Sequence, residues 1–380
     1  MRFIHLADLH IGKKVNGFSM LEDQRYILEQ VLSLIEEEKK GEKDIDGVLI
    51  AGDVYDKTVP TTEAVQLLDW FLTELVAQNM PVYIVSGNHD SGERLSFAAN
   101  LLKTSGVFLT SVYDGKMEPI RLKDAYGPLC LYLLPFIKPA HVKKAFDLDE
   151  LGSYQEAMET VFEHANMDTN VRNVLVAHQM VTGASRCDSE EVSVGGLDNI
   201  DSEVFDAFDY VALGHLHGPQ RVGRDEVRYA GTLLKYSFSE CHHKKSVTIV
   251  ELLEKGKVVI ETRELKPIRD MREITGLYED LMKKSFYEGN NQNDYISVVL
   301  TDELEVPDAF YRLRTVYPNM MKLEYNNRRT KMMKTMEQAD LDDNKQPMDY
   351  VRELYVSQNN QDMTETQEQL IQEMIERIWG

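Results

Sequence analysis

The stretch Tyr83-Ile-Val-Ser-Gly-Asn-His-Asp-Ser91 is a short β-branched and aromatic run that breaks into a polar tripeptide. Such a run predicts a strand, and Gly87 lets the backbone turn tightly after it. Asn88 offers a neutral oxygen to a hard metal ion, His89 offers an imidazole ligand or a proton, and Asp90 accepts hydrogen bonds. Alone, this tripeptide indicates a loop with a capping Asn about as well as a metal site.

Four other apolar segments end in the same manner. They are residues 2–7, 47–51, 171–177 and 209–213, and the residues 21–40 and those after Pro60 show helical periodicity between strands. Repeated strand, turn and helix units predict an α/β layer architecture. The residues that follow these four strands are Asp8 and His10, Asp53, His178, and His215 and His217. Residues 229–240 and the segments after residue 246 are expected to be further strands that close the domain.

These strand ends predict a metal site. The carboxyl ends of parallel strands line the ligand crevice of an open α/β fold, so the five groups are expected to converge. Any one group alone favours an ordinary surface loop, whereas five with the same placement do not. Two Asp, one Asn and four or five His suit Mn²⁺, Fe or Zn²⁺ and exceed the needs of one tetrahedral ion. A centre of two ions, about 3.5–4 Å apart, is the simplest explanation.

The order of these motifs resembles that of the calcineurin-like metallophosphoesterases, and within them the SbcD family of bacterial nuclease subunits. The motifs that carry the resemblance are Asp8-x-His10, Gly52-Asp53, Gly87 to Asp90, His178 and Gly214-His215-x-His217. Three strings point to the SbcD family, namely His5 to Gly12, Asn88 to Ser91, and Tyr236 to Glu240 after Ala230-Gly231-Thr232. The similarity extends over roughly residues 1–330. It implies a four-layer sandwich of two β-sheets flanked by helices, with a small α/β capping domain and a helical C-terminal tail.

The resemblance also implies a role for each candidate residue. Asp8, His10 and His217 would hold one ion, Asn88, His178 and His215 would hold the other, and Asp53 would bridge both. The ions would most readily be Mn²⁺. His89 would contact the scissile phosphate or protonate the leaving oxygen, and Asp90 would support the loop. Archaeal and eukaryotic relatives carry a His near the position of Asp56, so this sequence departs from their pattern there.

The activity implied is hydrolysis of DNA phosphodiester bonds, both as a double-strand exonuclease and as an endonuclease on single strands and hairpins. The family works with an SbcC-type coiled-coil ATPase in DNA break and hairpin processing, as a homodimer within a heterotetramer. The helices after Pro60 and after Glu93 are the candidates for the dimer contact. One alternative is a phosphatase or cyclic-nucleotide phosphodiesterase with the same metal site. A second is a metal-bearing scaffold without activity, against which the complete ligand set and His89 speak.

The chain is expected to divide into four parts. These are a nuclease domain (1–268), a capping domain (269–327), a linker (328–348) and a helical tail (349–380). The tail ends in an amphipathic stripe that follows a capping box at Thr364 and Gln367. This stripe either folds back or docks on the ATPase partner, and docking is favoured by the resemblance. Its apolar residues are Leu370, Ile371, Met374, Ile375 and Ile378.

Composition limits the protein class. At 380 residues the chain can hold two or three units and a substantial core. A net charge of −22 is unfavourable for a polynucleotide binder, unless bound cations and a basic partner reverse it locally. Three scattered cysteines argue against a disulfide framework, and Cys241-His242-His243 fits no zinc spacing. The absence of an evident signal peptide or apolar span predicts a cytoplasmic protein with a function at the nucleoid.

Overall fold

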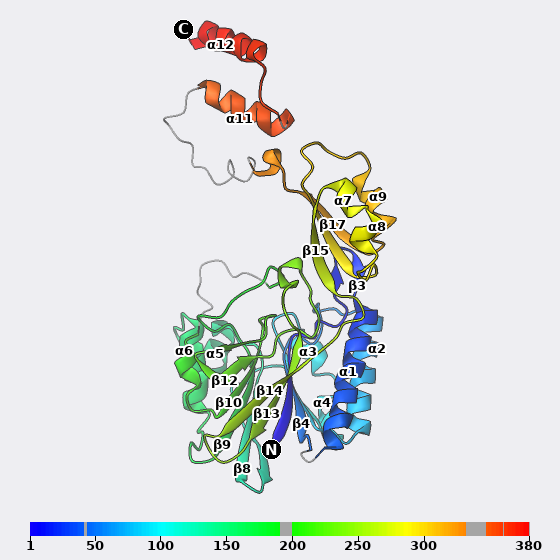
Figure 1. Cartoon of the computed structure of the whole chain (residues 1–380). Helices are drawn as coiled ribbons and strands as arrows, with labels where there is room; N and C mark the ends of the chain where they lie inside the picture. Colours follow the sequence, from blue (N-terminus) through cyan, green and yellow to red (C-terminus); the bar gives the residue numbers. More distant parts are fainter. Residues whose placement is uncertain (42–43, 191–199, 332–346, 360, 380) are drawn as a thin grey trace. The chain divides into compact units, whose positions relative to one another are not determined.

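The computed structural model describes the chain except for residues 42–43, 191–199, 332–346, 360 and 380 (Figure 1). The described residues form two compact units, Met1–Ile268 and Arg269–Gly380. Most of the predicted linker lies outside the described residues. So does the side chain of Ile378.

The first unit contains two six-stranded sheets. One sheet has the order β14-β13-β1-β4-β5-β6, in which β1, β4, β5 and β6 are parallel and β13 and β14 are antiparallel to their neighbours. Its strands are β1 (Arg2–Leu6), β4 (Gly47–Ala51), β5 (Val82–Val85), β6 (Val107–Thr110), β13 (Ser246–Leu252) and β14 (Val258–Glu264). A small hairpin of β2 (Lys14–Val15) and β3 (Phe18–Ser19) lies outside both sheets.

The second sheet has the order β11-β12-β10-β9-β8-β7. Its four inner strands are parallel, whereas the edge strands β7 and β11 pair antiparallel. The strands are β7 (Ile120–Asp124), β8 (Gly127–Leu134), β9 (Arg172–His178), β10 (Tyr210–Gly214), β11 (Gln220–Val222) and β12 (Arg224–Tyr229).

The two sheets pack face to face. Side chains of both sheets, among them Phe3, Tyr83, Leu131, Val174 and Tyr210, form one buried cluster. Such runs of apolar residues are buried on both faces, as is usual for parallel strands. The outer face of the second sheet packs against α5 (Pro139–Phe146) and α6 (Tyr154–His164). The helices α1 (Leu21–Lys39) and α2 (Thr62–Ala77) lie beside the first sheet (Figure 1). The predicted four-layer α/β sandwich is therefore confirmed.

The helix after Pro60 shows how sequence sets these layers. Thr61 caps α2, since its hydroxyl accepts a hydrogen bond from the backbone N–H of Ala64. Leu67, Phe71 and Leu75 recur at helical spacing and are buried. This stripe holds α2 in the layer beside the first sheet.

Two local expectations are wrong. Residues 229–240 do not form a strand. β12 ends at Tyr229, and a loop leads to a short 3₁₀ helix, Phe238–Glu240. Gly231 lies at φ +72°, and a Cβ there would approach the backbone oxygen of His217 to 2.6 Å. The segment after Glu93 is likewise broken into α3 (Gly92–Leu95) and α4 (Ala99–Thr104), because Ala98 has a left-handed φ of 60°.

The second unit contains a parallel three-stranded sheet in the order β15-β16-β17. Its elements are β15 (Met271–Gly276), α7 (Tyr278–Leu281), α8 (Lys284–Tyr287), β16 (Tyr295–Leu300), α9 (Ala309–Arg314), β17 (Met320–Tyr325), α11 (Pro347–Asn359) and α12 (Glu365–Trp379). Ile274, Leu281, Val298 and Leu313 belong to its own apolar core. Among the described residues of both units, every helix is too short or too polar to cross a membrane.

Candidate metal centre

The polar residues that follow five strands meet at one end of the two sheets. β1, β4 and β5 of the first sheet and β9 and β10 of the second carry them. Asn88 and His215 are half-buried. The other predicted ligands are at most 2% exposed and are Asp8, His10, Asp53, His178 and His217. The structure thus brings all seven predicted ligands together, in two groups.

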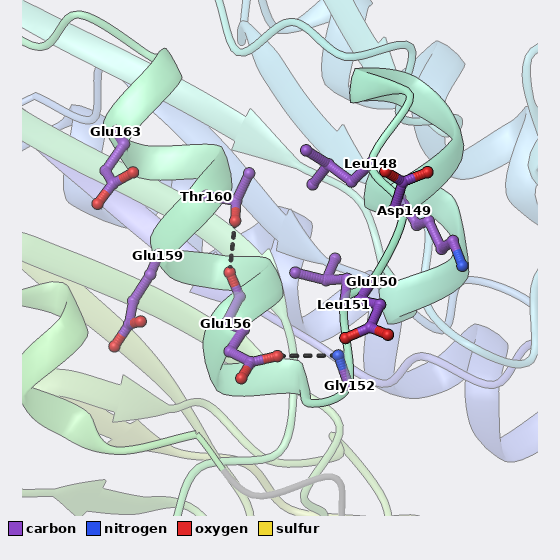
Figure 2. Close-up of a pocket in the computed structure, with 10 residues that line it drawn as sticks. Leu148, Asp149, Glu150, Leu151, Gly152, Glu156, Glu159, Thr160 and Glu163 are labelled. Carbon is purple, nitrogen blue, oxygen red and sulfur yellow. Dashed lines mark hydrogen bonds between the residues drawn. The ribbon is translucent and has the colours of Figure 1, made fainter.

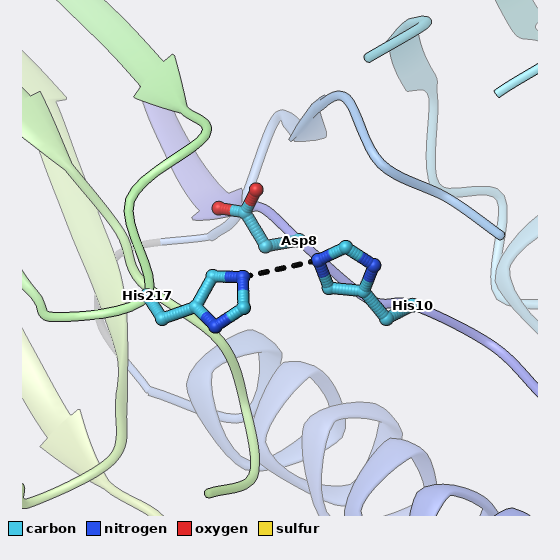
Figure 3. Close-up of side chains that lie close together, drawn as sticks. All are labelled: Asp8, His10 and His217. Atoms are coloured by element: carbon cyan, nitrogen blue, oxygen red, sulfur yellow. Dashed lines mark hydrogen bonds between the residues drawn. The ribbon is translucent and has the colours of Figure 1, made fainter. Parts of the chain in front are cut away.

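The first group contains Asp8, His10 and His217 (Figure 3). One ligand atom from each residue lies within 4.8 Å of the others. The Nε2 atoms of His10 and His217 are 3.1 Å apart. A neutral imidazole carries its lone pair on only one of its two ring nitrogens. When that nitrogen is Nε2 in both His10 and His217, the two atoms can bind the same cation.

The second group contains Asn88, His178 and His215. The side-chain oxygen of Asn88 lies 2.9 Å from Nε2 of His178 and 3.0 Å from Nδ1 of His215. Nδ1 of His178 contacts the backbone oxygen of Ala51 at 2.9 Å. That contact orients Nε2 of His178 toward the group, which is the usual way a protein fixes a histidine ligand.

The carboxylate of Asp53 joins the two groups. Its Oδ2 atom lies 3.6 Å from Nε2 of His10 and 3.4 Å from Nε2 of His178. Its Oδ1 atom accepts a hydrogen bond from the backbone N–H of His89 at 2.9 Å. One oxygen of Asp53 therefore faces a histidine of each group.

The residues fit divalent ions. Oδ2 of Asp8 and Nδ1 of His10 are buried and have no hydrogen-bond partner within the described part of the chain. Burial raises the pKa of Asp8 well above its usual value, and the neighbouring Asp53 adds to this effect. A buried carboxylate with an unpaired oxygen costs free energy unless a cation compensates it. Oxygen and imidazole donors in one place suit a borderline divalent metal.

Histidine protonation is consistent with ligation. Burial lowers the pKa of His10 well below its usual value, and burial followed by the charge of His178 lowers the pKa of His215 to about 3. Both rings are therefore neutral, as a metal ligand must be. Burial opposes the charged form of His178, yet the Asp53 carboxylate raises its pKa to about 9. A cation at Asp53 would replace that proton.

The backbone is strained at the ligands. Asp8, His10, Asp53 and His215 all have positive φ angles, of 51°, 43°, 48° and 107°. Non-glycine residues rarely adopt such angles, and they cluster at functional sites. Their occurrence at four of the seven predicted ligands indicates that the fold holds these side chains for a purpose other than stability.

Two glycines permit close approach of the strand ends. A Cβ at Gly87 would lie 2.0 Å from Oδ1 of Asp53, and one at Gly214 would lie 1.8 Å from the backbone oxygen of Ala51. A side chain at Gly87 would push apart the loops after β4 and β5, and one at Gly214 would push the end of β10 away from the end of β4. These glycines therefore bring the ligand loops into contact.

His89 lies beside the first group but has different contacts. Its ring packs edge-on against His10, with centroids 4.9 Å apart. Nδ1 of His89 contacts the backbone oxygen of Asp56 at 3.1 Å. The side chain of Asp56 instead pairs with Lys13, at 2.8 Å. Asp56 thus orients His89 through its backbone oxygen, a contact that does not depend on the side chain at position 56.

Asp90 ties two ligand loops together. Its Oδ2 atom accepts hydrogen bonds from the backbone N–H groups of Gly87 and Val54, and its Oδ1 atom accepts one from Tyr55. Burial, with a smaller contribution from Asp53, raises its pKa to about 6. These three bonds fix the loop after β4 against the loop after β5.

Sequence reasoning missed the residues around His217. Ser189, Glu190 and Lys245 form hydrogen bonds with this histidine, and Glu240 accepts one from Ser189. Glu240 lies in the string Tyr236 to Glu240, which carries part of the family resemblance but has no role assigned by it. Ser189 and Glu190 follow no strand end, so no sequence signal indicated them.

Two hollows lie near the second sheet of the first unit and its helices. One, of about 760 Å³, is lined by Asn88, Phe136, Lys138 and Lys144, and so opens beside the second group. The other, of about 780 Å³, is shown in Figure 2. Its lining includes five carboxylates, those of Asp149, Glu150, Glu156, Glu159 and Glu163. That charge repels phosphate, so of these two hollows the one beside Asn88 is better suited to a phosphoester.

Comparison with known proteins defines the class. The family model described as calcineurin-like phosphoesterase matches residues 1–219. The SbcD_C model, described as type 5 capsule protein repressor C-terminal domain, matches residues 267–359. The fold, the ligand cluster and the first match together define a metal-dependent phosphoesterase.

A relative from Staphylococcus epidermidis (strain ATCC 12228 / FDA PCI 1200) narrows the class. It is named as the SbcD subunit of the SbcCD nuclease, and it is 33% identical over 328 residues, which are 85% of each chain. The chain therefore belongs to the SbcD family of calcineurin-like phosphoesterases, a family of metal-dependent nucleases. A solved structure titled as a novel archaeal phosphodiesterase covers 69% of this chain and all of its own, at 12% identity and a TM-score of 0.32.

Proposed function

We propose that this protein is a DNA nuclease that uses two divalent ions, most readily Mn²⁺, as a double-strand exonuclease and as an endonuclease on single strands and hairpins. The observation that carries the two-ion proposal is the position of Asp53 Oδ2, which faces His10 at 3.6 Å and His178 at 3.4 Å. One carboxylate oxygen between two ligand groups is the arrangement that two adjacent ions require.

Asp8, His10 and His217 would hold one ion, Asn88, His178 and His215 the other, and Asp53 both. When bound, the ions supply positive charge to the phosphoryl oxygens and lower the pKa of coordinated water. The mixed oxygen and imidazole donors suit Mn²⁺, Fe or Zn²⁺, and among these the family resemblance favours Mn²⁺. By holding the ions in place, these ligands would keep the scissile phosphate in a fixed position beside His89.

His89 is proposed as the group that assists the leaving oxygen. A backbone carbonyl only accepts hydrogen bonds, so the contact of His89 Nδ1 with the oxygen of Asp56 places a proton on Nδ1. Proton exchange with the substrate then falls to Nε2. Half-burial next to the metal ligands lets this atom reach a bound phosphodiester.

The hollow beside Asn88 supports a polymeric substrate. Phe136 offers an aromatic ring for a base, and Lys138 and Lys144 offer charges for the backbone phosphates. Because the lining also contains Glu93 and Asp114, cations and a basic partner would complete the phosphate contacts.

An SbcC-type coiled-coil ATPase is the proposed partner, because the relative is named as part of the SbcCD nuclease. The tail offers an apolar face for it: Leu370 and Met374 of α12 are 58% and 50% exposed.

A second copy of the chain is proposed as a further partner. Phe97 and Leu101, in the segment α3–α4, are 83% and 72% exposed and would be covered in a homodimer. A cytoplasmic location near the nucleoid follows from this function.

The test compares two substrates. The full chain, loaded with Mn²⁺, should cleave an end-labelled DNA hairpin far faster than it hydrolyses p-nitrophenyl phosphate or a cyclic nucleotide. Preference for the small esters would favour the phosphatase or phosphodiesterase alternative. Metal binding without hydrolysis of either substrate would favour the scaffold.

A further inference from the structure

A chain of hydrogen bonds leads away from the metal ligand His217. The hydroxyl oxygen of Ser189 lies 2.6 Å from Nδ1 of His217 and 2.6 Å from Oε1 of Glu240. Glu240 itself is farther from the ring, at 3.6 Å. Ser189 therefore stands between the carboxylate and the imidazole.

The number of available protons determines which group donates in the two hydrogen bonds of Ser189. A serine hydroxyl has one hydrogen, and an ionised carboxylate can only accept. Ser189 must therefore donate to Glu240, so its oxygen accepts from an N–H at Nδ1 of His217. A neutral imidazole protonated at Nδ1 carries its lone pair on Nε2. That is the atom of His217 that lies 3.1 Å from Nε2 of His10 in the first group.

Lys245 keeps the carboxylate ionised. Its ammonium group donates to Oε2 of Glu240 at 2.6 Å, to the hydroxyl of Thr232 at 2.7 Å and to the backbone oxygen of His217 at 2.9 Å. This ion pair favours the ionised form of the buried carboxylate. The three donors of the lysine are all used, and its side chain is 4% exposed.

The residue after Ser189 restrains the same histidine through its backbone. Oε1 of Glu190 accepts from the N–H of His217 at 2.6 Å, and its Oε2 accepts from the N–H of Cys187 at 2.9 Å. The ring, the amide and the carbonyl of His217 thus each have a hydrogen-bond partner. Two of these partners are adjacent in sequence, although they lie 28 and 27 positions before His217.

We propose that Ser189 and Glu240 are positioning residues that fix His217 in the tautomer protonated at Nδ1, with Lys245 holding Glu240, and so direct Nε2 of His217 to a divalent ion. This inference rests on the proposed metal site. Partners of this kind make a histidine a better ligand, and their loss typically lowers metal affinity by about 10–100-fold.

Ser189→Ala is the main variant. Alanine would leave Glu240 at 3.6 Å from Nδ1, beyond a good hydrogen bond, so the tautomer preference should be lost. Ser189→Thr retains a hydroxyl and should restore it. Ser185→Ala is the matched control, because Ser185 lies in the same loop and its N–H contacts Gln220 rather than a ligand.

The first readout requires no metal. Nitrogen NMR of the metal-free full chain, labelled with ¹⁵N-histidine, should find His217 protonated at Nδ1 in the wild type, the threonine variant and the control, and a mixture of tautomers in Ser189→Ala. Thermal unfolding identifies a variant that fails to fold. For that case Glu240→Gln is the second variant, and it should also disturb the tautomer, because an amide can donate to the hydroxyl.

The second readout is Mn²⁺ binding by calorimetry. Ser189→Ala should weaken one site by about tenfold or more, whereas Ser189→Thr and Ser185→Ala should bind as the wild type does. Nε2 protonation in the wild type, or unchanged affinity in a folded Ser189→Ala protein, would overturn the proposal. Absence of Mn²⁺ binding by the wild type would instead overturn the proposed function, and the NMR result would still decide the tautomer.

Discussion

The Nε2 atoms of His10 and His217 lie 3.1 Å apart, although 207 positions separate the two residues in sequence. Without a shared cation or proton, two lone pairs at this distance repel each other. The loops after β1 and β10 maintain the contact through left-handed backbone at His10 and His215. A cation held by both nitrogens would remove this repulsion.

Asp53→Asn should weaken both ions together. The amide removes the negative charge that faces His10 and His178, while its size preserves the packing. Elemental analysis should find less than half of the wild-type Mn²⁺, and DNA cleavage should fall by at least about 100-fold, since bound metal supplies several kcal/mol to the reaction. Asp56→Asn is the control and should retain most activity, because Asp56 contacts His89 through its backbone oxygen. Full Mn²⁺ content in Asp53→Asn would contradict a bridging role.

His89→Asn should separate catalysis from metal binding. His89 is proposed to act on the leaving oxygen rather than to hold an ion, so Mn²⁺ content should stay at the wild-type level. Turnover should fall by about 10²–10⁴-fold, the usual contribution of a general acid. A variant that cleaves DNA at the wild-type rate would remove His89 from the mechanism.

Much of this site is predictable from sequence because it depends on a simple rule. Parallel strands place their carboxyl ends at one edge, so polar residues that directly follow apolar runs can be expected to meet. The rule identified Asp8, Asp53 and His178 without knowledge of their contacts. The alternation of strands and helices predicted an α/β layer architecture, and the family resemblance implied the four-layer sandwich.

The residues that sequence reasoning missed act at long range. Ser189 and Glu240 lie 51 positions apart and meet only because the chain after β12 leaves the sheet. Aromatic and apolar residues in that segment favour a strand, but the turn at Gly231 and the hydrogen bond from Thr232 to the oxygen of His217 prevent one. Tertiary contacts of this kind override local propensity.

The same charge reversal at two neighbouring lysines of α5 should test the substrate path. Lys144 lines the hollow beside Asn88, whereas Lys143, its neighbour on the same short helix, lines the acidic hollow of Figure 2. Lys144→Glu should raise KM for a DNA hairpin by about fivefold to tenfold at low salt, with kcat little changed, because a rim charge affects mainly association. Lys143→Glu has the same net charge and should have a much smaller effect. Equal effects would indicate a general charge response and contradict a path through this hollow.

Asp124 should make stability depend on pH in the acid range. Burial would raise its pKa, but hydrogen bonds from Arg172 outweigh burial and lower it. A lowered pKa means that the folded state gains stability above the unfolded value of about 3.9 and loses it as the pH falls below that value. Asp124→Asn should therefore reduce the free energy of unfolding of the metal-free chain by about 1–3 kcal/mol at pH 7.

The difference in the free energy of unfolding between Asp124→Asn and the wild type should shrink as the pH falls below about 4, because the wild-type carboxylate then becomes protonated and no longer adds stability. Chemical denaturation at several pH values measures this difference. Asp225→Asn is the control: its partner Arg221 is exposed, and such pairs contribute little. A difference that is constant from pH 7 to pH 3 would show that packing, rather than charge, accounts for the effect of Asp124.

The tail should be separable from catalysis. Residues 340–380 include α11 and α12, and the apolar side chains of Leu370 and Met374 are exposed on α12. Removal of this segment should abolish co-purification with the proposed coiled-coil ATPase partner, yet leave Mn²⁺-dependent cleavage within about twofold, because the ligand loops all lie before residue 268. Met374→Glu should act in the same way by placing a charge in the apolar contact, whereas Gln369→Glu, at an exposed polar position of the same helix, should not. Retention of the ATPase by the truncated chain would assign the docking surface to another part of the protein.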